Sequence, residues 1–304
     1  MLRPLSRFAR IAAFLLIAPW TAAPACADTI LFIGNSFTVG ALSPVQNYRP
    51  ETVTDLNKDG TGGVPALFKA FTTEAGLHYE VSLEAVGGAN LDLHYSQKSP
   101  LFTRPWDHVV LQAYSTLDEK APGDATTVVD YAARLALLFR AQDPRVDVRL
   151  MATWSRADQT YLPSGHWFGQ PIERMALDIR AACNRATEHT PEIRAVIPVG
   201  QAWNRAMAGG LAVRNPLLPI PKGQIDLWAP DNYHASSYGY YLEALVIYGS
   251  VSGNDPRTLG DKEVAAAELG LAPAEAHALQ QIAFDTLAAE VRTPEQSQKG
   301  TKAR

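Results

Sequence analysis

Short apolar runs alternate with stretches of helical periodicity along most of the chain. The run at 30–33 contains no polar residue, which is typical of a parallel strand buried on both faces. Similar runs at 79–86, 106–112, 148–153 and 195–199 predict four more strands. Five strands separated by helices predict a parallel sheet covered on both faces, that is, an α/β fold built as a three-layer α/β/α sandwich.

Apolar residues three or four positions apart predict the helices between and after these strands. The predicted helices cover 64–75, 124–142, 171–188, 236–251, 261–269 and 273–291. The segment 43–63 is different, because it is polar, rich in turn-forming residues and without periodicity. At about twenty residues it exceeds an ordinary connection, so we interpret it as a candidate lid or binding loop.

The ends of the chain differ in composition from the rest. Residues 1–27 have a basic start, an apolar stretch at 11–20 and a small-residue cleavage site at Ala25-Cys26-Ala27, the pattern of a secretory signal peptide. We therefore expect export to the periplasm or beyond; a stable membrane span is not expected, because the apolar stretch is short. Attachment through Cys26 as a lipoprotein is a weaker alternative. The mature part then comprises one domain over 28–292 and a polar tail over 293–304 that we expect to be disordered.

Composition and charge indicate which binding partners and which covalent cross-links to expect. The formal net charge is -4, from 27 Lys and Arg against 31 Asp and Glu, and no basic block is present, which argues against nucleic acid. Cleavage near Ala27 would leave Cys183 as the one cysteine, so an internal disulfide is not expected. The sequence leaves the oligomeric state open.

The first predicted strand stops at Gly34-Asn35-Ser36. In an open α/β sheet, chemistry takes place beyond the carboxyl ends of the strands, so Ser36 is a candidate nucleophile. An ordinary turn is the alternative interpretation. A serine hydroxyl needs a base and a group that orients the base, and Asp231 and His234 lie together just ahead of the helix predicted from 236.

Two other strand ends carry groups that suit a developing oxyanion. Gly87 and Gly88 follow the second strand and permit a backbone N–H to face a ligand, although a simple turn explains them equally. Gln112 ends the third strand, where its amide is able to donate to an oxyanion or simply to satisfy loop backbone. Ser115 is a weaker candidate for the same role.

Aromatic residues follow the later strands. Trp154, Trp203 and Tyr233 are candidates for lining a substrate cleft, and with Asn35 they form the set that we expect to contact substrate. Packing on the protein's own surface is the alternative. The remaining histidines lack paired ligand spacing and no Gly-x-Gly-x-x-Gly motif follows a strand, so we expect neither a metal nor a cofactor.

Taken together, these motifs resemble those of the SGNH or GDSL-type serine hydrolases. Gly34-Asn35-Ser36 is similar to the first block of that family, Gly88 to the second-block glycine, and Asp231-x-x-His234 to the last block. The resemblance implies a flavodoxin-like sheet and ester hydrolysis by a Ser36, His234 and Asp231 triad, with the Ser36 and Gly88 N–H groups binding the oxyanion. The third block departs from the family, because Gln112 stands at the strand end where the family supplies an asparagine.

We therefore expect an exported serine esterase that hydrolyses a short acyl ester such as acetyl. Its substrate is expected to be a small-molecule or glycan ester, because export and aromatic loop residues suit an acetylated carbohydrate. Two alternatives use the same residues: a relative that binds carbohydrate without efficient turnover, and an O-acetyltransferase that modifies an exported polysaccharide.

Overall fold

A computed structural model describes residues 27–299, with side chains as far as residue 291. The predicted signal segment lies outside the described residues except for its last position, and so do residues 300–304. Among residues 27–299, no helix combines the length and the hydropathy that crossing a bilayer requires.

The centre of the molecule is one parallel sheet of six strands in the order β2-β3-β1-β4-β5-β6. The strands are β1 (Asp28–Gly34), β2 (Thr54–Asp55), β3 (Tyr79–Ala85), β4 (His108–Gln112), β5 (Asp147–Met151) and β6 (Ile193–Ile197). The predicted sheet had five strands. The additional strand, β2, forms inside the segment 43–63 and has two residues, too few to give an alternating pattern in the sequence.

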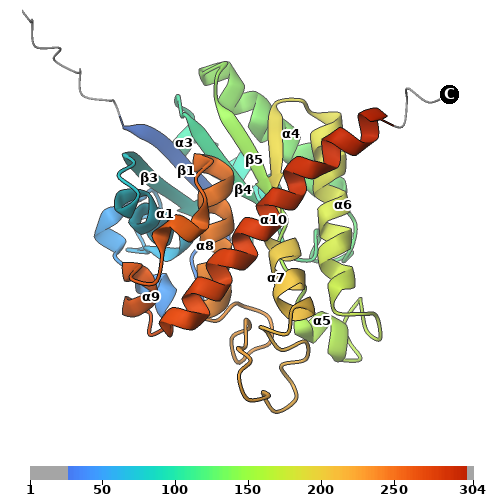
Figure 1. Cartoon of the computed structure of the whole chain (residues 1–304). Coiled ribbons are helices and arrows are strands. Elements are labelled where there is room, and N and C mark those ends of the chain that lie inside the picture. The colour runs from blue at the N-terminus through green and yellow to red at the C-terminus, as the bar shows by residue number, and fades with distance from the viewer. Residues whose placement is uncertain (1–26, 300–304) are drawn as a thin grey trace, which may run out of the picture.

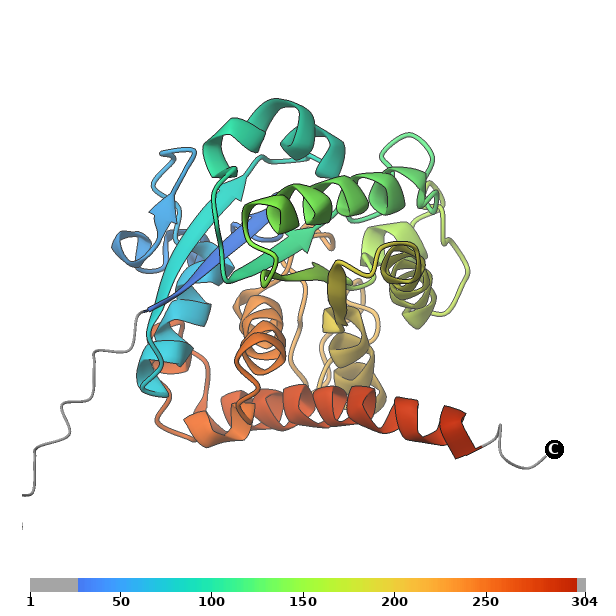
Figure 2. The same cartoon turned by 90° about the horizontal axis from the view of Figure 1, so that it is seen from above.

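Helices cover both faces of the sheet, as the predicted three-layer sandwich requires. The main helices are α1 (Gly63–Glu74), α4 (Thr126–Gln142), α6 (Glu173–His189), α7 (Val199–Ala208), α8 (Ser237–Ser252) and α10 (Pro273–Lys299). Shorter helical segments are α2 (Leu91–Leu93), a π-helical turn (His94–Lys98), α3 (Ser99–Phe102), α5 (Ala157–Tyr161) and α9 (Val264–Glu268). Figures 1 and 2 show α10 lying along the outside of α7 and α8, while α4 covers the opposite face of the sheet.

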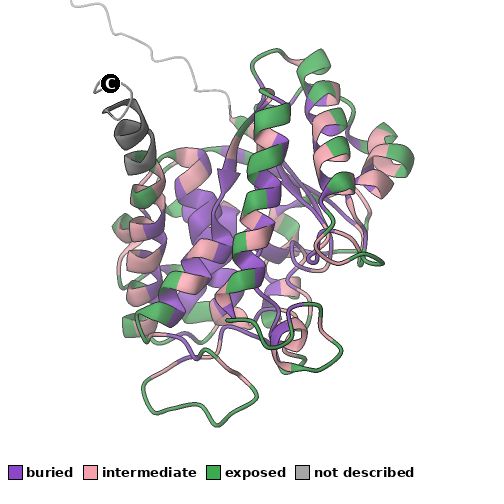
Figure 3. Cartoon of the chain, turned by 90° about the vertical axis from the view of Figure 1, so that its right-hand side faces the viewer, coloured by how far each residue is buried: buried purple, intermediate pink, exposed green. Residues whose placement is uncertain are grey.

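Strand β1 explains why a continuous apolar run predicted a buried strand. Ile30 and Phe32 pack into the cluster beneath α1 and α8, whereas Leu31 and Ile33 pack into the cluster beneath α4. Successive side chains point to opposite faces of a strand, so both faces are apolar here. Figure 3 shows the same arrangement for the whole chain, with buried residues at the sheet and exposed residues on the outer sides of the helices.

Three segments differ from the sequence predictions. Helix α7 occupies Val199–Ala208, where the sequence analysis predicted the end of a strand and no helix, because the chain passes directly from β6 into a helix after Pro198. The short segments between Leu91 and Phe102 were not predicted. Helix α10 continues to Lys299, beyond position 291 where the predicted helix ended. The tail predicted over 293–304 stays a prediction.

Candidate active site

Ser36 lies in the turn that follows β1, at the carboxyl end of the sheet. Val39 N–H donates to Asn35 O (3.1 Å) and Ala41 N–H to Ser36 O (3.0 Å), which folds the turn tightly. Gly34 has no substitute here, since a Cβ atom would lie 2.1 Å from Thr38 Oγ1. Ser36 is half-buried, and among the described residues its hydroxyl has no hydrogen-bond partner.

Asn35 was expected to contact substrate, and the structure contradicts this. The residue is 3% exposed, and its side chain is fully engaged within the protein. Its Nδ2 donates to Ala89 O (2.9 Å), and its Oδ1 accepts the N–H of Phe37 (3.2 Å). Asn35 therefore joins the Ser36 turn to the turn that follows β3.

Gln112 was expected to donate to an oxyanion, and in the structure its side chain is hydrogen-bonded within the protein. Its Oε1 accepts hydrogen bonds from Asn35 N (2.9 Å) and Thr38 Oγ1 (3.0 Å), and its Nε2 donates to the carbonyl of Ala113. The side chain is 1% exposed. Gln112 holds the Ser36 turn in place, and one of the two N–H groups of its Nε2 is bound by the Ala113 carbonyl.

Ser115, the weaker candidate, is buried too, and its hydroxyl accepts a hydrogen bond from Arg156 (3.2 Å).

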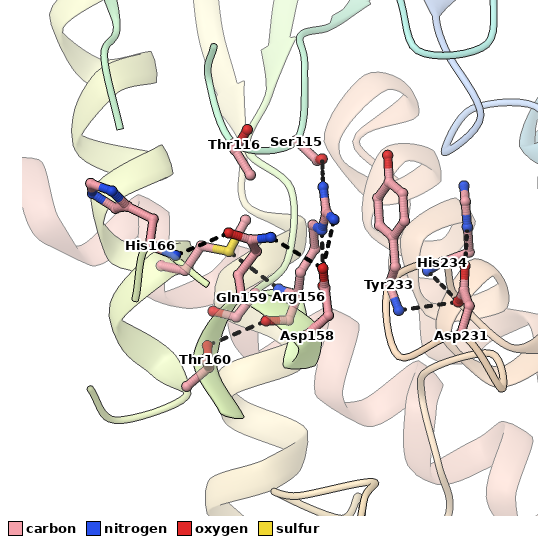
Figure 4. A network of polar contacts seen from close by, with 12 residues as sticks. Ser115, Thr116, Arg156, Asp158, Gln159, Thr160, His166, Asp231, Tyr233 and His234 are labelled. Carbon is pink, nitrogen blue, oxygen red and sulfur yellow. Dashed lines mark hydrogen bonds and ion pairs between the residues drawn. The ribbon is translucent and has the colours of Figure 1, made fainter. Parts of the chain in front are cut away.

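Asp231 and His234 form the predicted pair. Asp231 Oδ2 lies 2.6 Å from His234 Nδ1, and Asp231 Oδ1 accepts the backbone N–H groups of Tyr233 (3.1 Å) and His234 (2.9 Å). Burial raises the pKa of Asp231, but these hydrogen bonds outweigh it and leave the pKa below its ordinary value. A carboxylate held in this way fixes the ring orientation and the tautomer of the imidazole. Figure 4 shows the pair at the loop ahead of α8.

The segments carrying Ser36 and His234 are adjacent through Phe37. The Phe37 and His234 rings meet edge to face with their centroids 5.7 Å apart. His234 Nε2 is buried and has no hydrogen-bond partner, so within the described residues no hydrogen bond joins it to the Ser36 hydroxyl. Tyr240 of α8 adds a second link, because its hydroxyl donates to Ala41 O at 3.1 Å and to Ser36 O at 3.4 Å.

Trp154 and Trp203 were expected to line the cleft, and the structure contradicts both. Each is 0% exposed. Trp154 stacks between Phe37 (centroids 4.1 Å apart, planes at 6°) and Trp203 (4.7 Å, 4°), and its Nε1 donates to Tyr233 O at 3.3 Å. This set, Phe37, Trp154 and Trp203, is called the aromatic stack below. It supports the turn before His234 and the turn of Ser36 from beneath.

Tyr233, the remaining candidate, is half-buried, and its ring lies on the guanidinium of Arg156 at 3.5 Å. Arg156 is also bound by Asp158 through two hydrogen bonds (2.7 and 3.0 Å) and donates to Ser115 (Figure 4). The sequence analysis did not identify Arg156, since a single arginine after a strand carries no pattern. The residue anchors Tyr233, the neighbour of His234, to the loops after β4 and β5.

Gly88 lies in the turn after β3 with φ +71°, in the region that favours glycine. It is exposed, a Cβ atom there would meet nothing within 4 Å, and among the described residues its N–H has no acceptor. The neighbouring Ala89 carbonyl is the one that Asn35 binds, so the turn is tied to Ser36. Within residues 27–299, no group of three or more His, Cys, Asp and Glu side chains is arranged to hold a metal ion.

Comparison with solved structures places this fold among known ones. A DUF4886 family protein from Bacteroides uniformis is 17% identical, with a TM-score of 0.58, over 86% of this chain and 95% of that one. A protein described as a GDSL-like lipase from Parabacteroides merdae is 16% identical (TM-score 0.51; 74% and 95%). LAE5, an alpha/beta hydrolase enzyme from the metagenome of Lake Arreo, is 15% identical (TM-score 0.50; 75% and 97%). The expected SGNH-type fold is confirmed.

No family model and no curated protein matches the sequence.

Proposed function

We propose that this protein is an exported serine esterase that removes a short acyl group, acetyl above all, from an alcohol. The observation that carries the proposal is the state of His234. Asp231 fixes one of its ring nitrogens at 2.6 Å, while the other is buried without a partner beside Phe37, the residue next to Ser36. An oriented imidazole with one free nitrogen close to a free serine hydroxyl is the arrangement of a general base and its nucleophile.

The reaction follows from these positions. Ser36 Oγ attacks the ester carbonyl carbon while His234 Nε2 accepts the hydroxyl proton, and Asp231 stabilises the imidazolium that forms. His234 then gives the proton to the leaving alcohol, which leaves an acyl group on Ser36. A water molecule, activated by His234 in the same way, releases the acid and restores the serine.

No hydrogen bond joins the Ser36 and His234 side chains in the part of the chain that the structure describes. Catalytic hydrogen bonds are often long in substrate-free structures and shorten when substrate binds. The Ser36 turn and the His234 loop are each held by several hydrogen bonds, so we expect a rotation of the Ser36 side chain, and not movement of either segment, to close the distance.

The tetrahedral intermediate needs donors for its oxygen, and backbone N–H groups supply them in this proposal. The N–H groups of Ser36 and Gly88 are both without acceptors in the described residues. The Gln112 side chain is hydrogen-bonded within the protein, so the proposed oxyanion hole has two backbone donors. One lost donor typically costs about 2.7 to 4 kcal/mol of transition-state stabilisation, so a modest turnover number is expected.

The substrate class rests on the sequence and on the shape of the site. A predicted signal peptide favours an extracellular or periplasmic ester, and the absence of long apolar loop runs near Ser36 favours a short acyl group. Of the three aromatic candidates from the sequence, Tyr233 is the one left to contact a sugar ring, because both tryptophans are buried. An acetylated carbohydrate is therefore the proposed natural substrate.

The test compares hydrolysis of p-nitrophenyl acetate by the parent and by the variants Ser36→Ala, His234→Gln and Asp231→Asn. Each variant is expected to lose on the order of 10⁴-fold or more in kcat, as in other serine triads. Ser96→Ala changes an exposed serine elsewhere and should leave the rate unaltered. A fluorophosphonate should add its mass to the peptide carrying Ser36. Full activity of Ser36→Ala would refute the proposal.

The same experiment separates the two alternatives. An O-acetyltransferase would transfer acetyl to an added glycan faster than to water. A protein that only binds carbohydrate would retain a glycan on a column yet show no Ser36-dependent hydrolysis.

A further inference from the structure

A pocket opens directly beside the turn that carries Gly88. Its volume is about 310 Å³, at the lower end of the range of small-molecule sites, roughly 300–1,000 Å³. Its lining includes Gly88, Asn90, Asp92, Tyr114, Asp118 and Glu119. We call it the 88–127 pocket, after the first and last residues of its lining.

Asn90 fixes the two walls of this pocket to each other. Its Nδ2 donates to Leu117 O (2.8 Å), and its Oδ1 accepts the N–H of Tyr114 (3.0 Å). Asp118 Oδ1 accepts the N–H groups of Lys120 and Ala121, both at 2.8 Å, which folds the outer loop back on itself. The pocket is thus formed before any ligand arrives.

A short series of contacts leads from the pocket to the loop of His234. Ser115, the chain neighbour of Tyr114, accepts a hydrogen bond from Arg156 (3.2 Å), and the Arg156 guanidinium lies 3.5 Å from the centre of the Tyr233 ring. The 88–127 pocket therefore contains a proposed oxyanion donor, Gly88, and is linked from Tyr114 through Arg156 to the neighbour of the proposed base. A group filling it would extend from an ester whose carbonyl lies at Ser36.

The charge of the lining is one-sided. Asp92, Asp118 and Glu119 contribute three carboxylates, and Lys120 contributes one ammonium group, so two negative charges are uncompensated. None of these four side chains takes part in the ion pairs found among residues 27–299. The rest of the lining is hydrogen-bonding and aromatic rather than apolar, apart from Leu93 and Ala89.

We propose that the 88–127 pocket binds the alcohol part of the ester and selects a polyhydroxylated alcohol that carries no negative charge. Carboxylate oxygens and amide groups accept and donate to sugar hydroxyls, and Tyr114 offers an aromatic face at the pocket wall. An ammonium group on the alcohol is attracted, whereas a carboxylate or phosphate on it meets an excess of two negative charges. The inference rests on the proposed esterase function of Ser36.

The test uses three methyl glycosides, of glucose, glucosamine and glucuronic acid, each with one acetyl group on the 3-hydroxyl. Acetate release gives kcat/KM for each. The glucuronate ester is expected to be about fivefold or more poorer than the glucose ester at low salt, and the glucosamine ester equal to or better than the glucose ester. The gap should shrink in about 0.5 M salt, because screening weakens interactions between exposed charges.

Variants locate the selection in the pocket. The measured quantity is the ratio of kcat/KM for the glucose ester to kcat/KM for the glucuronate ester. This ratio should fall toward one in the double variant Asp92→Asn with Glu119→Gln, and it should rise in Lys120→Gln. Glu80→Gln is the control: Glu80 is exposed near the start of β3, the strand whose other end leads to Gly88, so the variant removes one negative charge, half the change in the double variant, outside the pocket lining. The ratio is measured within each variant, so a general loss of activity does not affect it.

Two results would overturn the inference: a parent that hydrolyses the glucuronate ester as well as the glucose ester, or a double variant with the parent's ratio. If none of the glycosides is hydrolysed while p-nitrophenyl acetate is cleaved in a Ser36-dependent way, the pocket assignment fails and the esterase proposal stands. If Ser36 proves dispensable for p-nitrophenyl acetate as well, both fail.

Discussion

Replacing Phe37 with leucine removes the top ring of the aromatic stack while keeping an apolar side chain of similar bulk. Phe37 is fully buried and contacts three rings: Trp154 at 4.1 Å, Tyr233 at 5.4 Å and His234 at 5.7 Å between centroids. It is also the residue next to the proposed nucleophile. The substitution therefore loosens the contact between the Ser36 turn and the His234 loop without emptying the core.

The size of the effect follows from those contacts. An aromatic pair contributes about 0.5–1.5 kcal/mol beyond its buried area, and only the Trp154 pair is closely stacked, so we expect the free energy of unfolding to fall by about 2 kcal/mol. The decrease in kcat should be larger than this loss of folding stability would suggest. A displacement of about 1 Å between reacting groups costs on the order of 10²-fold, so kcat is expected to fall tenfold to a hundredfold while KM for a short ester changes little.

The assay pairs urea unfolding with kcat for p-nitrophenyl acetate at 25 °C, where both variants remain folded. Phe139→Leu is the matched control, because Phe139 is 1% exposed and packs on Phe102 with centroids 5.6 Å apart in the cluster on the other face of the sheet. It should lose about 1–2 kcal/mol of stability and keep its kcat. If Phe37→Leu keeps its kcat within twofold while losing the same stability, the aromatic stack only packs the core and the reasoning is wrong.

Three further predictions concern polar groups that are buried or hydrogen-bonded. Gln112→Ala should lower the free energy of unfolding by about 1–3 kcal/mol, because the buried N–H of Asn35 loses its acceptor. The urea midpoint measures this loss, and an unchanged midpoint contradicts it. Hydrogen bonds lower the pKa of Asp231 in the folded state. Its contribution to stability is therefore present above its unfolded pKa of about 3.9 and is lost as the pH falls through the lower folded value. In Asp231→Asn, the urea midpoint should depend less on pH between about pH 5 and 2 than in the parent. Burial raises the pKa of Glu243 well above its ordinary value, and both carboxyl oxygens lack partners. Stability is then lost as the pH rises above the unfolded pKa of about 4.3, so Glu243→Gln should raise the urea midpoint more at pH 8 than at pH 4, and an equal gain at both would contradict protonation in the folded state.

The parts of the site that the sequence predicted are those set by local geometry. An apolar run that ends in Gly-Asn-Ser predicts a strand followed by a tight turn, and β1 and the Ser36 turn have this form. The spacing of three residues between Asp231 and His234 lets one carboxylate bind two backbone N–H groups and the ring at once, which a loop of that length allows on its own. Neither feature depends on where the rest of the chain lies.

The parts that could not be predicted depend on partners distant in sequence. A tryptophan after a strand is equally able to face solvent or the core, and Trp154 faces the core because α7 places Trp203 against it. Helix α7 itself was missed. Arg156 gave no signal, since its importance comes from Ser115 and Tyr233, which lie in other loops.

Gln112 shows how a side chain at the end of one strand positions backbone groups at the end of another. Its carbonyl oxygen reaches across from the end of β4 to the N–H of Asn35, and Asn35 in turn holds the carbonyl of Ala89, beside Gly88. The side chains at the two strand ends therefore serve to fix the positions of two backbone N–H groups, those of Ser36 and Gly88. A backbone N–H cannot rotate away from a ligand as a side-chain amide can. The proposed oxyanion hole therefore keeps its geometry without a ligand and needs little reorganisation during the reaction.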